Sequence, residues 1–441
     1  VRPPRAAATA MWAPPRRLGR RQAARARIVG VRNHLRYVVA HDGRFSSGHP
    51  ACLGGRVGAG TISVVKRLSL VLGVLAAVTI PSAALGIGPP PVPGGSAWLL
   101  ADGATGEVLA EHNADTARPM ASLTKMLAAL VALDSGALDR VVTVPPSAAA
   151  VGESSAGLKP GERIVMRNLL RALLVQSGND AAVAIATGVA GSESAFVDLM
   201  NQKAKEMGLT ATNFANPHGL DAAGHQSSPR DLLTVAKAVM KEPVLRDIVG
   251  RRTITIPGPD GPRTLTSEND LLSIMPSADG VKTGHTDGAG YVEVAHATSP
   301  SLGVGLFAVL MGEDSRAQRA RDAKALLEWG FSNYARPTVV AKGTTVVRVP
   351  VQGAPGSDVA LHPASAVIAT VRLGKPIRLR ITAPSAISAP LVRGQGVGTV
   401  AVLQGDTVVA RSALVAPGAV ASPGFTDHLM AAFEGIRSVF T

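Results

Sequence analysis

Ser122 and Lys125 are the first pair of side chains in this sequence whose types and spacing could do chemistry. They lie three residues apart in a stretch whose apolar residues have the spacing of one helical face: Leu123, Met126, Leu127, Leu130 and Val131. Side chains three residues apart share a face of a helix, so a lysine with a lowered pKa could take the proton of the serine hydroxyl. The same spacing also fits a helix cap beside a surface lysine. The choice between these two interpretations depends on residues further along the chain.

Two further short motifs follow in order. Ser177-Gly-Asn179 lies in a tight link between two predicted helices, and Lys282-Thr-Gly284 lies on a predicted strand that continues into His285. Each motif alone is weak evidence. The ordered set Ser-x-x-Lys, Ser-x-Asn and Lys-Thr-Gly, however, is the active-site set of β-lactamases and penicillin-binding proteins. It indicates acyl transfer through a serine nucleophile.

The chain resembles the low-molecular-mass penicillin-binding proteins that act as serine-type D-alanyl-D-alanine carboxypeptidases. The likeness covers about residues 96 to 335 and includes longer motifs: Ser122-Leu-Thr-Lys-Met, Ser177-Gly-Asn-Asp-Ala, Asn216-Pro-His-Gly-Leu, Asp279-Gly-Val-Lys-Thr-Gly-His-Thr and the run from Met311 to Gly330. The first 95 residues do not share it. The resemblance implies a hydrolase that needs no cofactor and no metal.

The resemblance also implies a role for each residue of the first two motifs. Ser122 would attack the carbonyl of the penultimate D-Ala and form an acyl-enzyme. Lys125 would be its general base, kept neutral by burial and by the positive charge of Lys282. Ser177 would pass the proton to the leaving amine, and Asn179 would position Lys125 and the substrate amide.

The third motif would bind the substrate. Lys282 and Thr283 would hold the terminal carboxylate, and the backbone N–H groups of Ser122 and His285 would form the oxyanion hole. Gly284 would leave room for a substrate laid along the strand. Arg319 matches the downstream arginine of the family, and a guanidinium suits a carboxylate.

Composition excludes several classes of function for the folded part. The 441 residues have a formal net charge of +14, but residues 1–67 alone hold 14 of the 45 Lys and Arg and one of the 31 acids. The rest of the chain is nearly neutral, which argues against a nucleic-acid partner. The single cysteine, Cys52, also lies in that leader. A disulfide framework or thiolate metal site in the folded part is therefore excluded.

The N-terminal region has the organisation of an exported protein. Residues 1–63 form a basic leader that is either disordered or not translated; we favour the second interpretation. Residues 64–87 have the pattern of a signal peptide, with Lys66-Arg67 followed by the apolar run 68–80 and small residues up to Ala84. A Pro/Gly linker over 88–95 follows.

The remaining chain predicts the penicillin-binding and β-lactamase-like transpeptidase fold, an α/β (α+β) arrangement. Residues 96–336 combine a predicted antiparallel sheet with a helical subdomain that spans about 140 to 250. Residues 338–418 are predicted to form a small all-β domain. Residues 424–441 predict an amphipathic C-terminal helix, whose apolar stripe fits either packing on its own protein or a membrane surface; we favour the membrane.

The expected partners are the peptidoglycan stem peptide ending in D-Ala-D-Ala, β-lactams as covalent inhibitors, and a membrane surface. The expected location is outside the cytoplasm. Three alternatives stay open: a D,D-endopeptidase, a β-lactamase with Glu153 or Glu193 as its water-activating base, and a non-catalytic sensor. His218, His225 and His285 lie in loops without metal-ligand spacing, so we expect them to make structural hydrogen bonds.

Overall fold

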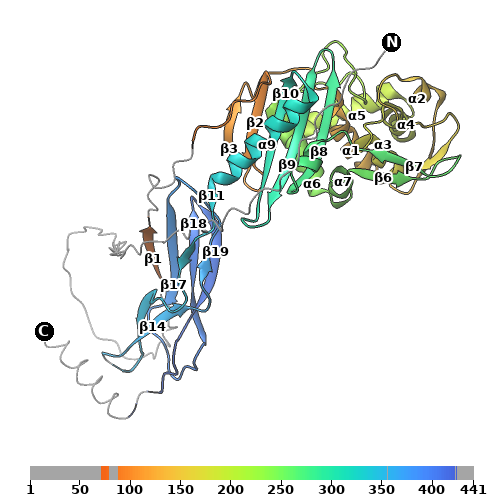
Figure 1. Cartoon of the computed structure of the whole chain (residues 1–441). Helices are drawn as coiled ribbons and strands as arrows, with labels where there is room; N and C mark the ends of the chain where they lie inside the picture. The colour runs from red at the N-terminus through yellow and green to blue at the C-terminus, as the bar shows by residue number, and fades with distance from the viewer. Residues whose placement is uncertain (1–70, 79–87, 355, 423, 425–441) are drawn as a thin grey trace, which may run out of the picture.

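The computed structural model describes residues 71–78, 88–354, 356–422 and 424, and these form two domains (Figure 1). The predicted leader over 1–63 lies outside the described residues, and so does the predicted C-terminal helix apart from Gly424. Part of the predicted signal peptide is described, as strand β1 (Val71–Val78). The signal peptide and the C-terminal helix therefore stay predictions.

A five-stranded antiparallel sheet is the framework of the N-terminal domain. Its order is β3-β2-β10-β9-β8, and the strands are β2 (Ala97–Asp102), β3 (Val108–His112), β8 (Ala278–Thr286), β9 (Gly290–Ser299) and β10 (Val304–Glu313). The long helix α9 (Arg316–Ser332) packs on β9 and β10. Strand β8 is at the edge of the sheet, so one of its sides is free to pair with another extended chain.

The helical subdomain surrounds one central helix. A short 3-10 turn, η2 (Ala121–Leu123), leads into α1 (Thr124–Asp134). Every side chain of α1 from Thr124 to Ala132 is buried. The helix is buried on all sides because α3, α4, α5 and α6 all pack around it. The spacing predicted one apolar face, and the buried surface of the helix is wider than that face. The other helices are α2 (Pro146–Ala150), α3 (Met166–Leu174), α4 (Asn179–Ala190), α5 (Glu193–Glu206), α6 (Pro229–Lys241), α7 (Pro243–Val249) and α8 (Leu271–Ile274).

Two short ribbons extend the subdomain, β4 (Val141–Thr143) with β5 (Arg163–Val165) and β6 (Thr253–Ile256) with β7 (Arg263–Thr266). Across the described ranges, no single helix has the length and apolar composition needed to cross a membrane. Only α4 and α5 taken together reach that length and composition, and they are bent by 85° relative to each other.

The C-terminal domain is all-β. Its six-stranded sheet has the order β1-β17-β18-β19-β14-β13. Strand β17 (Ile377–Pro384) alternates as predicted, with Ile377, Leu379 and Ile381 buried in the domain core. Strand β1 pairs antiparallel with the full length of β17. The other strands are β11 (Tyr334–Ala335), β12 (Thr338–Val340), β13 (Val347–Pro350), β14 (Asp358–Pro363), β15 (Val367–Ile368), β16 (Val371–Arg372), β18 (Gly396–Gln404) and β19 (Thr407–Val415).

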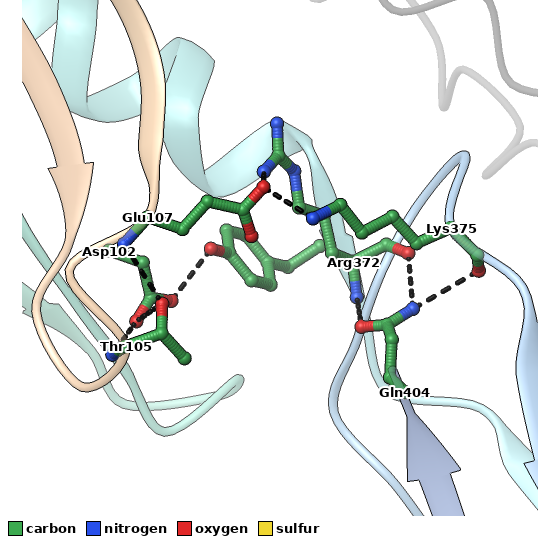
Figure 2. Close-up of polar contacts among 7 residues, drawn as sticks. Asp102, Thr105, Glu107, Arg372, Lys375 and Gln404 are labelled. Carbon is green, nitrogen blue, oxygen red and sulfur yellow. Dashed lines mark hydrogen bonds and ion pairs between the residues drawn. The ribbon is translucent and has the colours of Figure 1, made fainter. Parts of the chain in front are cut away.

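Polar side chains connect the two domains at the turn between β2 and β3 (Figure 2). Tyr334 donates its hydroxyl to Asp102 at 2.7 Å. Glu107, at the other end of the turn, pairs with both Arg372 and Lys375 of the C-terminal domain. We call these five residues the interdomain joint. It links the C-terminal domain to the central sheet of the N-terminal one.

Candidate active site

Ser122 lies on η2, in a backbone segment that is held under strain. Ala121, just before it, has a φ of +46°, which residues with a side chain rarely adopt. Thr124 donates its hydroxyl to the carbonyl oxygen of Ala121 at 2.8 Å, and His225 Nε2 lies 2.7 Å from the same hydroxyl. His225 Nδ1 accepts from the backbone N–H of Ala215, so in the neutral ring Nε2 carries the proton and donates it to Thr124. This chain of bonds fixes the nucleophile segment.

Lys125 lies directly beside the serine. Its Nζ is 2.7 Å from Ser122 Oγ, 2.8 Å from Asn179 Oδ1 and 2.5 Å from the carbonyl oxygen of His218. Burial lowers the pKa of Lys125 well below its usual value, and the positive charge of Lys282 lowers it further. A neutral amine has two N–H groups and one lone pair. The two oxygens of Asn179 and His218 take the two N–H groups, so the lone pair faces the hydroxyl of Ser122.

Ser177 and Asn179 lie in the tight link before α4. Ser177 has a φ of +62°, and within the described part of the chain its hydroxyl has no hydrogen-bond partner. Asn179 donates Nδ2 to the carbonyl oxygen of Gly152 at 2.9 Å, which turns Oδ1 toward Lys125. Strained backbone at both Ala121 and Ser177 is typical of a functional site.

Strand β8 brings the third motif to this cluster. Lys282 is buried, and burial is the main reason that its pKa falls to about 7. Thr283 is 5% exposed. The geometry gives Gly284 a further role, and the predicted one, room for the substrate, stays a prediction. A Cβ on Gly284 would lie 2.7 Å from the backbone nitrogen of Ser122 and 3.0 Å from Cβ of Ala121, so glycine is needed for η2 itself to pack on the strand.

His285 is exposed near the end of β8, whereas Arg319 is buried on α9. The ring of His285 packs on Tyr291 with centroids 4.1 Å apart, which leaves only its backbone for the predicted oxyanion role. Arg319 is 2% exposed, with Nε 3.2 Å from Glu293 Oε2, and it donates to the carbonyl oxygen of Glu268. Burial raises the pKa of Glu293 to about 7. The structure therefore places Arg319 in a buried pair between α9 and β9, and its contact with a substrate carboxylate stays a prediction.

Known proteins share both domains of this chain. The family described as D-alanyl-D-alanine carboxypeptidase matches residues 89–315, and the one described as Penicillin-binding protein 5, C-terminal domain, matches residues 334–422. The D-alanyl-D-alanine carboxypeptidase DacC of Escherichia coli (strain K12) is 37% identical over 323 residues, which cover 69% of this chain and 78% of that relative. DacF of Bacillus subtilis (strain 168), of the same description, is 32% identical over 341 residues, or 75% and 87% of the two chains. The chain belongs to the D-alanyl-D-alanine carboxypeptidase family.

Solved structures agree with this membership. Penicillin binding protein 5 from Haemophilus influenzae superposes with a TM-score of 0.55 at 30% identity, over 76% of this chain and 99% of that one. The predicted fold of sheet, helical subdomain and all-β domain is confirmed. So is the predicted class of enzyme, a serine-type hydrolase of the D-alanyl-D-alanine carboxypeptidase kind. Neither Glu153 nor Glu193, the two glutamates considered for a β-lactamase, is hydrogen-bonded to Ser122 or Lys125 in the described ranges.

The motif Asn216-Pro-His-Gly-Leu carried part of the resemblance in the sequence, but no role was predicted for it. In Asn216-Pro-His-Gly, Asn216 accepts from the N–H of Gly219 at 2.7 Å, and this turn aims the carbonyl oxygen of His218 at Lys125. Gly219 has a φ of +100°, and a Cβ on it would lie 2.2 Å from the carbonyl oxygen of Ala121. The turn residues were visible in the sequence, but their contact with the nucleophile segment was not.

His218 and His225 are neutral hydrogen-bonding groups, whereas the ring of His285, which was expected to make a hydrogen bond, makes none in the described residues and packs on Tyr291. Burial, assisted by the charge of Lys125, lowers the pKa of His218 to about 4, and burial is also the main cause of a pKa of about 4 for His225. Among the residues that the structure describes, no group of three or more His, Cys, Asp or Glu could hold a metal ion.

Proposed function

We propose that the protein removes the terminal D-Ala from peptidoglycan stem pentapeptides through an acyl-enzyme at Ser122. The observation that carries this proposal is the position of Lys125 Nζ, which lies 2.7 Å from Ser122 Oγ. Its two other hydrogen-bond partners, Asn179 Oδ1 and the carbonyl oxygen of His218, are both acceptors. As Ser122 Oγ bonds to the carbonyl carbon of the penultimate D-Ala, its proton moves to Lys125. The N–H groups of Ser122 and His285 stabilise the resulting oxyanion.

The tetrahedral intermediate then breaks its C–N bond. The proton now on Lys125 passes through Ser177 to the leaving amine of the last D-Ala, which leaves Lys125 neutral again; the Ser177 hydroxyl has no partner elsewhere in the described residues. Lys282 and Thr283, with Arg319 as the expected third contact, hold the terminal carboxylate until D-Ala departs. Water then attacks the ester, gives its proton to Lys125 and releases the shortened peptide, which restores the Ser122 hydroxyl.

The same nucleophile accounts for penicillin binding. A β-lactam presents an amide carbonyl beside a carboxylate, as the peptide does, and Ser122 opens its ring to form an ester. The leaving nitrogen stays tethered to the acyl group, so it remains in the site instead of diffusing away. We therefore expect β-lactams to inhibit the enzyme covalently.

The substrate class places the enzyme outside the cytoplasm, in the cell wall or a periplasm-like space. The predicted signal peptide over 64–87 supports export. We further propose that the predicted amphipathic helix over 424–441 binds the membrane surface, because it carries phenylalanines on one face and follows a Pro/Gly break.

The test is release of free D-Ala from a pentapeptide that ends in D-Ala-D-Ala, with Ser122→Ala as the control. We expect release by the wild-type protein and none by the variant. Labelling of Ser122 by a fluorescent penicillin without D-Ala release would instead favour the endopeptidase or the sensor. If the wild-type protein shows neither release nor labelling, the proposed function is wrong.

A further inference from the structure

We propose that the N-terminal domain has a second site, which binds a phosphate-type anion. The site is a cavity of about 270 Å³ lined by Lys237, Lys241, Arg246, Asp279 and His296. We call it the cationic pocket. None of the residues assigned to catalysis or substrate binding lines it.

Three positive side chains meet at this pocket without a counter-ion. Lys237 and Lys241 lie one turn apart on α6 and so share a face, and Arg246 comes from α7. Over the ranges that the structure describes, none of these three side chains makes an ion pair or a hydrogen bond. Like charges gathered around one cavity repel one another. An anion in the pocket would remove that repulsion.

The floor of the pocket is a buried histidine held in one orientation. His296 on β9 is 9% exposed, and its Nδ1 contacts the carboxylate of Asp279 at the start of β8. His296 Nε2 has no hydrogen-bond partner among the described side chains. A Cβ on Gly305 would lie 2.9 Å from Nε2, so glycine at that position leaves this nitrogen uncovered.

Asp279 is the one carboxylate in the lining, and it is engaged by His296. Apart from His296, the ionisable side chains of the lining are three basic groups and one carboxylate. The side chains present are suited to a compact oxyanion, because a guanidinium binds it in a fork and ammonium groups act as point charges. An inorganic phosphate, a phosphomonoester and one unit of a phosphodiester polymer share this chemistry.

The cationic pocket is separate from the catalytic centre but adjoins the interdomain joint. Asp279 lies three residues before Lys282 on β8, about 10 Å along the strand. Gly103 and Ala104 also line the pocket, and they lie in the turn that carries Asp102 and Glu107 of the joint. A bound anion would therefore lie against the turn through which the two domains touch.

The proposal is tested by titrating the purified full-length protein with inorganic phosphate, with sodium chloride adjusted to keep the ionic strength constant. Binding is followed by calorimetry and by the melting temperature. The pocket variant is Lys237→Gln with Arg246→Gln. The matched control is Lys205→Gln with Lys342→Gln, which removes two charges that are also exposed and unpaired in the described structure.

We expect saturable binding to the wild type and the control, and binding at least about tenfold weaker to the pocket variant, because charge-assisted hydrogen bonds are lost. D-Ala release should be the same in all three proteins. Equal binding to the pocket variant and the control would overturn the proposal. So would a response no larger than that to chloride, or tighter binding of a dicarboxylate such as succinate.

A second titration with a glycerol phosphodiester oligomer distinguishes the sources of the anion. Oligomer binding that competes with inorganic phosphate and is lost in the pocket variant would support the site and assign it to a polymer phosphodiester. Phosphate binding without oligomer binding would support the site and assign it to a free phosphate or a phosphomonoester. Oligomer binding that persists in the pocket variant would count against the proposal.

Discussion

The catalytic centre and the interdomain joint both contain ionisable side chains, but these differ in their exposure to water. Lys125 is fully buried, and burial moves its pKa far below the usual range. In the joint, the side chains of Arg372, Glu107 and Lys375 are 18%, 35% and 46% exposed. Burial therefore changes the protonation of the lysine in the catalytic centre, whereas the partly exposed side chains of the joint form ion pairs.

This difference in exposure predicts that a single substitution has a larger effect in the catalytic centre than in the joint. In the buried centre, a charge has few compensating partners, so each neighbour changes the chemistry of Lys125. In the joint, water and salt screen the pairs, and such exposed pairs contribute between zero and about 1 kcal/mol each. Four predictions test this contrast, from the largest expected effect to the smallest.

The largest effect is expected from Lys125→Arg. A guanidinium stays protonated and cannot accept the proton of Ser122, so kcat/KM for D-Ala release should fall about 10³- to 10⁴-fold. Lys159→Arg, on an exposed lysine, should leave the rate unchanged. Activity of Lys125→Arg within tenfold of the wild type would show that Lys125 is not the base.

The next effect is steric and comes from Gly284→Ala. The added Cβ would lie 2.7 Å from the backbone nitrogen of Ser122, so η2 must shift. We expect a loss of about 1–3 kcal/mol in the free energy of unfolding and acylation by a fluorescent penicillin at least about tenfold slower. Gly396→Ala is the matched control, since a Cβ there has nothing within 4 Å. Equal behaviour of the two variants would contradict the packing argument.

A smaller effect is expected on the pH profile. The positive charge of Lys282 lowers the pKa of Lys125, after burial, so its removal in Lys282→Gln should raise that pKa. The base is active when neutral, and the acidic limb of kcat/KM should therefore move to higher pH, whatever the loss in substrate binding. Lys342→Gln should leave the limb in place. An acidic limb at the same pH in Lys282→Gln and the wild type would show that the charge of Lys282 does not affect the pKa of Lys125.

The smallest effect is expected at the joint, from Glu107→Gln. Burial raises the pKa of Glu107, but hydrogen bonds and charge attraction from Lys375 and Arg372 outweigh it, so the net shift is downward. Its contribution to stability is therefore present above the unfolded pKa and lost as pH falls through the folded pKa. We expect Glu107→Gln to cost less than about 1 kcal/mol of unfolding free energy at pH 7 and a smaller amount at pH 3.

Denaturant unfolding at the two pH values measures this difference, with Asp198→Asn as a control on an exposed carboxylate that is unpaired in the described structure. Penicillin acylation should be unchanged in both variants. A loss above about 2 kcal/mol in the free energy of unfolding would show that water does not screen the ion pairs of the joint. Slower penicillin acylation would show that the joint affects the active site.

Local sequence predicted much of the fold. A helical subdomain over about 140 to 250 and an all-β domain over 338–418 were predicted, and α2 to α7 and β12 to β19 lie in those ranges. The ordered motifs predicted one site from Ser122, Lys125, Ser177, Asn179 and Lys282. In the structure Lys125 interacts with Ser122, Asn179 and Lys282, and Ser177 lies two residues before Asn179. These features were predictable because each depends on residues that are close in the sequence.

Tertiary structure decided the rest, because it joins residues that are far apart in the chain. Lys125 meets Asn179 across 54 residues and the carbonyl of His218 across 93, and only this arrangement points its lone pair at Ser122. Packing of η2 on β8 explains Gly284. Packing of α9 on β9 buries Arg319, which the sequence predicted to face the substrate. The sequence by itself predicted which groups do the chemistry, because the motifs are local, and long-range packing determined the burial and direction of those groups.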